Sequence, residues 1–444
     1  MNTLIFRFAT ITFFLSILFS LTGQTIAIKN FDRRGQQVIF ASHYGNSVYE
    51  ISKLYLDENG FGLIYNQQLN PGIYYLVFND SSTVEFLYDS LYRGKITIEG
   101  TGKNNFLTID GPAPTKLFDD YTKQLLNNNK GTASNDSITA EFAAKLPGSL
   151  LELYLNAQQK IKLPEYFPPE EIINKDSAIW MYQLNYYAQH YFDRVDFTDS
   201  RLIYTPVYTN LIDGFFEKAT QFNCTALIQN SNMLIEKCSV NPLYLNFTVH
   251  YLLQYFGKRK NLAEYECAYL HIIKNYFLEK AIESTGNDDI VILAKEYNRR
   301  KPASIGEIAP NIRIPETNIV AKTLHQLDKS YTILYFYSYD CPLCEKVTPE
   351  IKKLLHRYNY IDVGVFAVCT GNDAEKWKEY TLKNKLGLWT NIFDAENFNN
   401  TALAYNLNLV PALFLLDNEK RIIGKNLNTR QLEKYLFEIA SGRL

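Results

Sequence analysis

The chain has 444 residues, a formal net charge of −2, 46% hydrophobic residues and 21% charged residues. This length suffices for roughly two to four domains with hydrophobic cores of their own, and the ordinary balance of apolar and charged residues excludes a disordered protein. The near-neutral charge, without a run of Lys and Arg, argues against nucleic-acid binding.

The N-terminal segment has the order of charge and hydrophobicity that is typical of a secretory signal peptide. Arg7 precedes an apolar run from Ile11 to Leu21, and small or polar residues at 20–27 offer several cleavage points. We therefore expect residues 1–24 to be a signal peptide and the mature protein to lie in the periplasm or cell envelope. An uncleaved membrane anchor is the alternative, because the apolar run is near the short end of the length that spans a bilayer.

Residues 25–112 are expected to form a small β-sandwich. Short alternating segments are separated by turn sequences such as DENGFG, NPG and NDSS. In KITIE, for example, Ile96 and Ile98 alternate with polar neighbours, as in a strand with one buried face. Several strands at this spacing favour two packed sheets, and the sequence GPAP at 111–114 ends the pattern.

Residues 113–302 have apolar residues at helical spacing and are expected to form an all-α domain. Its aromatic and aliphatic stripes are interpreted as core packing rather than as the lining of a ligand groove. No cluster of His, Asp and Glu at metal-binding spacing occurs in this part of the sequence. The stripes comprise Leu146, Leu150, Leu153 and Tyr154; Val249, Leu252, Leu253 and Phe256; and Tyr265, Tyr269, Ile272 and Tyr276.

From residue 303 onward, predicted strands alternate with predicted helices, which indicates an α/β layer structure. The run YTILYFY at 331–337 is continuously apolar, as in a strand that is buried on both faces. A helix is predicted from Cys341 to Tyr358. The predicted elements that follow are the strand IDVGVFAVC, a helix over NDAEKWKEYTLKN, the short strand NIFDAE, a helix over NFNNTALAYN and the hairpin VPALFLLDNEKRIIG. Asn372 and Asn428 each precede a Glu or Gln by three residues, which is the capping-box pattern of a helix start.

Cys341 and Cys344 could form a redox centre, half of a zinc site or a structural disulfide. A zinc site needs about four ligands, and the sequence has no second C-x-x-C pair. A structural disulfide that closes so small a loop would add little stability. At a strand-to-helix junction, by contrast, the first sulfur lies at a helix N-terminus, where free N–H groups favour a thiolate. The context therefore favours the redox centre over the other two interpretations.

The sequence around this pair resembles the TlpA/ResA-like thioredoxin-fold proteins, which are exported thiol-disulfide oxidoreductases. The segments YTILYFYSYDCPLCEKVTPEI and LNLVPALFLLDNEKRIIG carry this resemblance, which extends from about Ile305 to the C-terminus. It implies that Cys341 is the attacking cysteine and Cys344 the resolving cysteine. It also implies that Val410 and Pro411 match the cis-proline site that helps to hold the substrate backbone. No metal and no organic cofactor is required.

Three positions depart from the pattern of that family. Tyr335 stands where thioredoxins usually have a buried aspartate, and Val347 stands where many relatives have a glutamate. These missing carboxylates put the handling of the resolving thiol's proton in question. Asp340 replaces a tryptophan that often precedes the first cysteine. A carboxylate beside the sulfur disfavours the thiolate, so we expect Asp340 to make the couple more reducing.

The remainder of the chain resembles domains that precede thioredoxin modules in Bacteroidetes proteins. GIYYLVFNDSSTVEFLYD is similar to their small β domain, and HYFDRVDFTDSRLIYTPVYTNLIDGFF is similar to an uncharacterised helical domain. The predicted fold is therefore multidomain. It comprises a signal peptide at 1–24, an N-terminal β-sandwich at 25–112, a middle all-α domain at 113–302 and a C-terminal α/β thioredoxin fold at 303–444.

The other four cysteines are expected to be structural. Cys369 ends an apolar strand and is expected to be a small buried residue. Cys224 and Cys238 are spaced so that they could form a disulfide. Cys267 lies near a helical stripe and is expected to be packed.

These features predict an exported thiol-disulfide oxidoreductase that reduces protein disulfides. A disulfide-containing protein would be its substrate, and a membrane electron donor would recharge it. Operation as an oxidant would instead require a membrane electron acceptor. The alternative is a cell-envelope binding or scaffold protein whose thioredoxin module is a spectator or a redox sensor, because most of the mature chain lies outside that module.

Overall fold

The computed structural model describes residues 24–100, 107–128, 135–280, 282, 285–314, 323–394 and 399–443. The predicted signal peptide at 1–24 lies outside the described residues except for Gln24. The chain divides into two compact units. One comprises Met1–Lys160 with Arg201–Asn210, and the other comprises Ile161–Ser200 with Leu211–Leu444.

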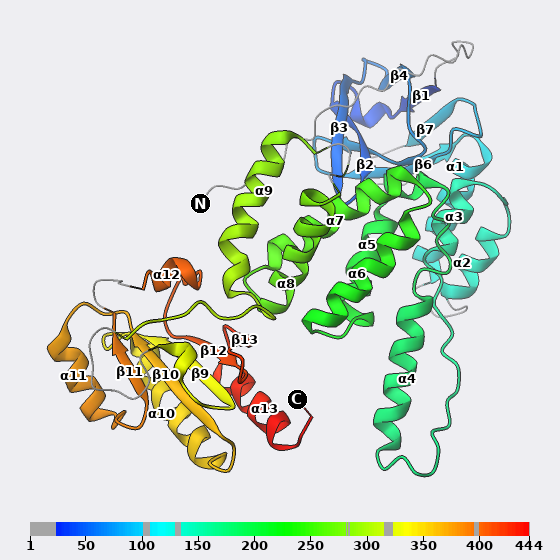
Figure 1. Ribbon diagram of the computed structural model, residues 1–444. Helices are drawn as coiled ribbons and strands as arrows, with labels where there is room; N and C mark the ends of the chain where they lie inside the picture. The colour runs from blue at the N-terminus through cyan, green and yellow to red at the C-terminus, as the bar shows by residue number, and fades with distance from the viewer. Residues whose placement is uncertain are drawn as a thin grey trace. The chain divides into compact units, whose positions relative to one another are not determined.

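The first unit begins with a β-sandwich, as the sequence predicts. Its described strands are β1 (Gln24–Lys29), β2 (Gln37–Tyr44), β3 (Ser47–Tyr55), β4 (Phe61–Gln67), β5 (Gly72–Phe78), β6 (Thr83–Tyr88), β7 (Ile96–Gly100) and β8 (Leu107–Asp110). They form two four-stranded sheets, ordered β4-β1-β7-β8 and β3-β2-β5-β6 (Figure 1). Buried side chains from both sheets form one core, among them Ile98 of the first sheet and Phe40 of the second. Ile96 and Ile98 are both fully buried, as their alternation with polar residues predicts.

Three helices of the same unit follow the strands: α1 (Ala113–Asn127), α2 (Asn135–Ala143) and α3 (Leu150–Asn156). The predicted helical stripe that begins at Leu146 is wrong, because α3 begins only at Leu150 and a different set of its residues faces the core. Gly148, with a φ of 77°, lies in the turn before α3. The Ser149 hydroxyl then caps α3 by accepting a hydrogen bond from the Glu152 N–H at 3.1 Å. The buried residues of α3 are consequently Leu150, Leu151 and Leu155.

The second unit contains a helical region followed by an α/β region. The boundary between the units falls within α5 (Pro206–Gly214), and the other helices are α4 (Lys175–His190), α6 (Cys224–Cys238), α7 (Pro242–Arg259), α8 (Ala263–Ile272) and α9 (Asn287–Arg300). Both stripes predicted for this region are buried, which confirms that they form core: Val249, Leu252, Leu253 and Phe256 on α7, and Tyr265, Tyr269, Ile272 and Tyr276 on α8 and the π-helical segment that follows it.

A disulfide links α6 to α8 within the helical region, and it answers the open question of whether Cys224 pairs with Cys238. Cys224 is bonded to Cys267, with 5.9 Å between their Cα atoms. Cys224 and Cys238 cannot pair, because they are the first and last residues of one continuous helix of 15 residues, and their Cα atoms are therefore ~21 Å apart. Cys238 keeps its thiol, which is buried 3.3 Å from the Thr248 hydroxyl.

The α/β region consists of β9 (Tyr331–Tyr337), α10 (Pro342–Arg357), β10 (Val363–Cys369), α11 (Ala374–Lys383), β11 (Thr390–Phe393), α12 (Thr401–Ala404), β12 (Ala412–Leu416), β13 (Ile422–Lys425) and α13 (Thr429–Ala440). Its strands form one sheet in the order β11-β10-β9-β12-β13 (Figure 1). The first three strands in this order are parallel, whereas β12 and β13 run antiparallel to their neighbours. The predicted multidomain arrangement of β-sandwich, helical region and α/β fold is therefore confirmed.

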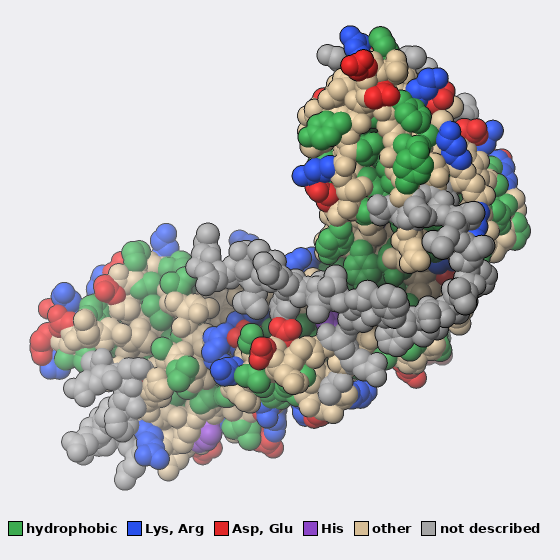
Figure 2. All heavy atoms as spheres, turned by 90° about the horizontal axis from the view of Figure 1, so that it is seen from above, with side chains coloured by type: hydrophobic (Ala, Val, Ile, Leu, Met, Phe, Trp, Pro, Cys, Tyr) green, Lys and Arg blue, Asp and Glu red, His purple; other side chains and the backbone are tan. Residues whose placement is uncertain are grey.

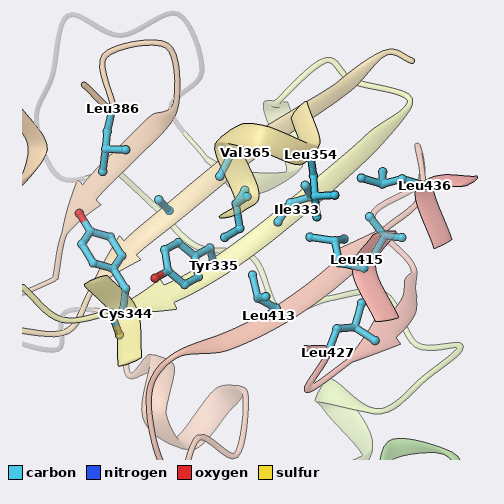
Figure 3. Close-up of a cluster of buried hydrophobic side chains, with 14 of the residues drawn as sticks. Ile333, Tyr335, Cys344, Leu354, Val365, Leu386, Leu413, Leu415, Leu427 and Leu436 are labelled. Atoms are coloured by element: carbon cyan, nitrogen blue, oxygen red, sulfur yellow. The ribbon is translucent and has the colours of Figure 1, made fainter. Parts of the chain in front are cut away.

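The central strand β9 is buried on both faces, as its continuous apolar run predicts. Ile333 and Tyr335 contribute to a core on the α10 and α13 side of the sheet, which Figure 3 shows, and Leu334 and Phe336 contribute to a second core on the other side. The side chains of β9 alternate between these two cores, because successive residues of a strand point to opposite faces.

Two helix starts were predicted from capping boxes, and one of them is confirmed. Asn428 and Gln431 form the reciprocal pair at the start of α13. The other prediction is wrong by one residue: Asp373, rather than Asn372, caps α11 by accepting the N–H groups of Glu375 and Lys376. Asn372 instead accepts a hydrogen bond from the Tyr339 hydroxyl at 3.0 Å.

The described residues include no helix that is both long and apolar enough to cross a bilayer. In the space-filling view of Figure 2, Lys and Arg side chains are interspersed with Asp and Glu, in keeping with the net charge of −2. Within the described ranges, no group of three or more His, Cys, Asp or Glu side chains is arranged to hold a metal ion.

Candidate redox site

Cys341 occupies the N-terminal cap of α10. Strand β9 ends at Tyr337, a short turn follows, and Pro342 opens the helix, where its missing N–H costs nothing. The backbone N–H of Cys344 donates a hydrogen bond to the Cys341 sulfur at 3.3 Å. This sulfur therefore lies where the free N–H groups and the helix dipole stabilise negative charge.

The two cysteines differ in accessibility. Cys341 is half-buried at the surface, whereas Cys344 is fully buried in the core between the sheet and α10. Only the first thiol can be reached by a large partner. Both are thiols in this structure, so the site is described in its reduced form.

The sequence-predicted residues Val410 and Pro411 lie beside Cys341. The peptide bond between them is cis, and the Cys341 thiol donates a hydrogen bond to the Val410 carbonyl at 3.5 Å. They meet because β12 runs antiparallel to β9 and pairs Ala412 with Phe336, which brings the start of β12 to the end of β9. The structure thus places all four predicted site residues together.

Apolar side chains flank this site, and the sequence reasoning did not single them out. Leu343, between the two cysteines, is 56% exposed, and Leu409, just before the cis peptide, is 83% exposed. Their positions within the two motifs were the available signal. Both side chains therefore present exposed apolar surface close in sequence to the cysteines and the cis peptide.

Burial dominates the electrostatics of Cys344. It raises the pKa of the Cys344 thiol to about 12, since a buried thiolate loses its solvation.

Two carboxylates that are close in sequence to the cysteine pair, Asp340 and Glu345, are both exposed. Asp340 accepts a hydrogen bond from the Ser338 hydroxyl, and Glu345 pairs with Lys383 at 3.2 Å. The expected effect of Asp340 on the redox couple stays a prediction.

Tyr335, which replaces the usual aspartate, is the first of three hydroxyl groups that are hydrogen-bonded in series near Cys344. Its hydroxyl lies 3.0 Å from that of Thr348, which in turn lies 2.8 Å from that of Tyr380. The sequence reasoning missed both partners. Thr348 follows Cys344 by one helical turn and could have been found by that spacing, whereas Tyr380 comes from α11 and its position depends on tertiary packing.

Cys369 lies at the end of β10 and is fully buried in the same core as Cys344. Burial raises the pKa of its thiol to about 11. It therefore has the environment of a small core residue, as expected from the sequence.

Residues 328–422 match a protein-family model described as thioredoxin-like, and this range includes all four predicted site residues. No curated protein matches the sequence.

Among solved structures, a thioredoxin-like protein from Bacteroides caccae is 18% identical, and the match covers 63% of this chain and 98% of that protein with a TM-score of 0.43. A domain of a possible thiol-disulfide isomerase from Cytophaga hutchinsonii is 26% identical. The match covers 32% of this chain and 96% of that domain, with a TM-score of 0.29. The thioredoxin domain of a thiol-disulfide oxidoreductase from Bacteroides vulgatus is 21% identical. That match covers 31% of this chain and 97% of that domain, with a TM-score of 0.29.

Proposed function

Since the C-terminal part of this chain is a thioredoxin-like domain, we propose that the protein is an exported thiol-disulfide oxidoreductase that reduces protein disulfides through Cys341 and Cys344. The observation that carries this proposal is the asymmetry of the pair. One sulfur is accessible at a helix N-terminus, and the other thiol is buried one turn along the same helix. This arrangement suits one cysteine for attack on a substrate and the other for release of the product.

The reaction would proceed in two exchanges. The Cys341 thiolate attacks one sulfur of the substrate disulfide and bonds to it, and the other substrate sulfur leaves as a thiolate that takes up a proton. Cys344 then loses its proton and attacks the Cys341 sulfur. The second substrate sulfur leaves and is protonated, so the substrate has gained two electrons and the pair has become a disulfide.

The same proposal includes the location and the partners of the protein. The N-terminal sequence supports export to the periplasm or cell envelope. A disulfide-containing protein is the substrate, and the exposed Leu343 and Leu409 beside the sulfur would contact its apolar segments. A membrane electron donor would return the oxidised pair to the dithiol, because each turnover consumes two electrons.

Catalysis of protein disulfide reduction by dithiothreitol tests this proposal. We expect the full-length protein to accelerate the reduction of a model protein disulfide well above the rate with dithiothreitol alone. The Cys341→Ser variant is the reference, because it keeps the fold and lacks the attacking sulfur. Equal rates for the wild-type protein and this variant would remove the enzymatic function.

The raised pKa of Cys344 predicts that resolution is the slow step and depends on pH. With a pKa of about 12, only a small fraction of this thiol is ionised at neutral pH. We expect the resolving rate to rise about tenfold per pH unit between roughly pH 6 and 9, since the thiolate fraction rises by that factor below the pKa. Dithiobis(nitrobenzoate) separates the steps: attack by Cys341 releases the first thionitrobenzoate, and attack by Cys344 releases the second. A second release that is independent of pH over this range would contradict the expectation.

A further inference from the structure

The resolving thiol is buried without one of the carboxylates that would ordinarily receive its proton. Tyr335 and Val347 occupy the two positions where the family resemblance implies such groups. The charged side chains on the adjoining segments, Asp340 and Glu345, are exposed and have partners of their own at the surface. Cys344 must nevertheless become a thiolate to attack Cys341, so another group has to stabilise its charge.

Three buried hydroxyl groups, from β9, α10 and α11, form a chain near Cys344. Tyr335 of β9 contacts Thr348 of α10 at 3.0 Å, and Thr348 contacts Tyr380 of α11 at 2.8 Å. One end of the chain is at Cys344, whose carbonyl accepts a hydrogen bond from the Tyr380 hydroxyl at 3.3 Å. The other end, Tyr335, lies in the same buried core as the Cys344 side chain. Figure 3 shows the Tyr335 side chain reaching from β9 toward Cys344.

This chain can adopt two directions, because in both inner contacts either oxygen can be the donor. In one direction the Tyr335 hydroxyl donates to Thr348, Thr348 donates to Tyr380, and Tyr380 donates to the Cys344 carbonyl. In the other direction all three hydroxyls reverse, and Tyr335 donates to the Cys344 sulfur. The first suits a thiol, which can itself donate to the Tyr335 oxygen, and the second suits a thiolate, which can only accept.

The protonation of the tyrosines is consistent with a donor role. Burial raises the pKa of Tyr335 far above its usual value, and it raises the pKa of Tyr380 to about 12. Both therefore keep their protons at neutral pH and can donate hydrogen bonds. Burial raises the pKa of Cys344, and donation of a hydrogen bond from Tyr335 to the sulfur acts in the opposite direction and lowers it.

We propose that Tyr335 is a positioning residue for the resolving step, in which the chain of Tyr335, Thr348 and Tyr380 reverses to donate a hydrogen bond to the Cys344 thiolate. This inference rests on the proposed oxidoreductase function. The chain gives up no proton in the step. The proton of Cys344 passes to solvent, and the departing substrate thiolate takes one up, so the charges balance.

The Tyr335→Phe variant tests the proposal, because it removes one hydroxyl and keeps the ring. We expect the second thionitrobenzoate release to slow by about 10- to 100-fold at pH 7, the factor for the loss of a hydrogen bond to a charged group. The pH profile of this second release should lie at higher pH in the variant than in the wild-type protein. The first release, which depends on Cys341 alone, should change by less than about twofold.

Tyr337→Phe is the matched control. Tyr337 lies on the same strand and in the same core, but its hydroxyl bonds to Asn391 at 2.9 Å and to Trp377 at 3.1 Å. This variant should leave both releases unchanged. Thr348→Val interrupts the middle of the chain at constant shape and should also slow only the second release, which keeps the test available if Tyr335→Phe folds poorly.

The outcomes separate this inference from the proposed function. If the wild-type protein releases two equivalents but Tyr335→Phe and Thr348→Val match Tyr337→Phe in the second step, the hydroxyl chain has only a structural role and the inference is wrong. If the wild-type protein releases a single equivalent, Cys344 does not resolve the mixed disulfide and the proposed function itself fails.

Discussion

Replacement of Cys341 by serine is expected to reduce disulfide-reductase turnover to the uncatalysed rate, whereas Cys344→Ser should stop the reaction after its first step. A serine hydroxyl is not ionised at neutral pH and cannot attack a disulfide, so Cys341→Ser has no route into the reaction. In Cys344→Ser the accessible sulfur remains and can still bond to the substrate. Mass spectrometry of the reaction should therefore find a mixed disulfide with Cys344→Ser and none with Cys341→Ser.

Cys369→Ala provides the control for these variants. Cys369 is buried in the same core, so this variant removes a third thiol of the domain without touching the proposed exchange. Its turnover should match that of the wild-type protein. A mixed disulfide on Cys369, or loss of turnover in a folded Cys369→Ala variant, would contradict the assignment of the reaction to Cys341 and Cys344.

Removal of the disulfide between α6 and α8 should have the largest effect on stability. The bond joins residues that are 43 positions apart, and the chain-entropy relation gives about 4 kcal/mol for a loop of this length. We expect the Cys224→Ser and Cys267→Ser double variant to lower the free energy of unfolding by about 3–4 kcal/mol. Urea unfolding followed by far-UV circular dichroism measures this change, since the bond lies among the helices.

Cys238→Ser is the matched control for the double variant. Cys238 ends the same helix that Cys224 begins, and its buried sulfur lies beside the Thr248 hydroxyl, which can hydrogen-bond to a serine. This substitution should lower the free energy of unfolding by less than about 1.5 kcal/mol. Equal losses in the two proteins, or alkylation of Cys224 without prior reduction, would show that the bond does not form.

The local pattern of the sequence was sufficient for the central strand of the α/β region and for the position of Cys341 at a helix start. The unbroken apolar run of β9 predicted burial on both faces, and the cysteine pair after it predicted a sulfur at a helix start. Both predictions agree with the structure because each depends on a short stretch of chain. The approach of Val410 and Pro411 to Cys341 followed from the family resemblance, and β12 provides its physical reason by pairing with β9.

Other features depended on tertiary packing or on exact helix ends. The sequence left open whether Cys224 pairs with Cys238, because the two residues are separated only by the continuity of α6. Cys267 is the partner because α8 packs on α6. Likewise, Tyr335 could be read as a missing carboxylate, but its link to Tyr380 required the position of α11.

The reduction potential of the Cys341 and Cys344 pair tests the proposed reductase most directly. It can be titrated in the full-length protein against glutathione and dithiothreitol buffers, with thiol trapping and mass spectrometry to count the oxidised pair. We predict a reversible two-electron couple at or below about −270 mV, the range of thioredoxin. A potential above roughly −150 mV, toward the strong oxidants, would reverse the direction of electron flow. A pair that cannot be cycled would contradict the redox function itself.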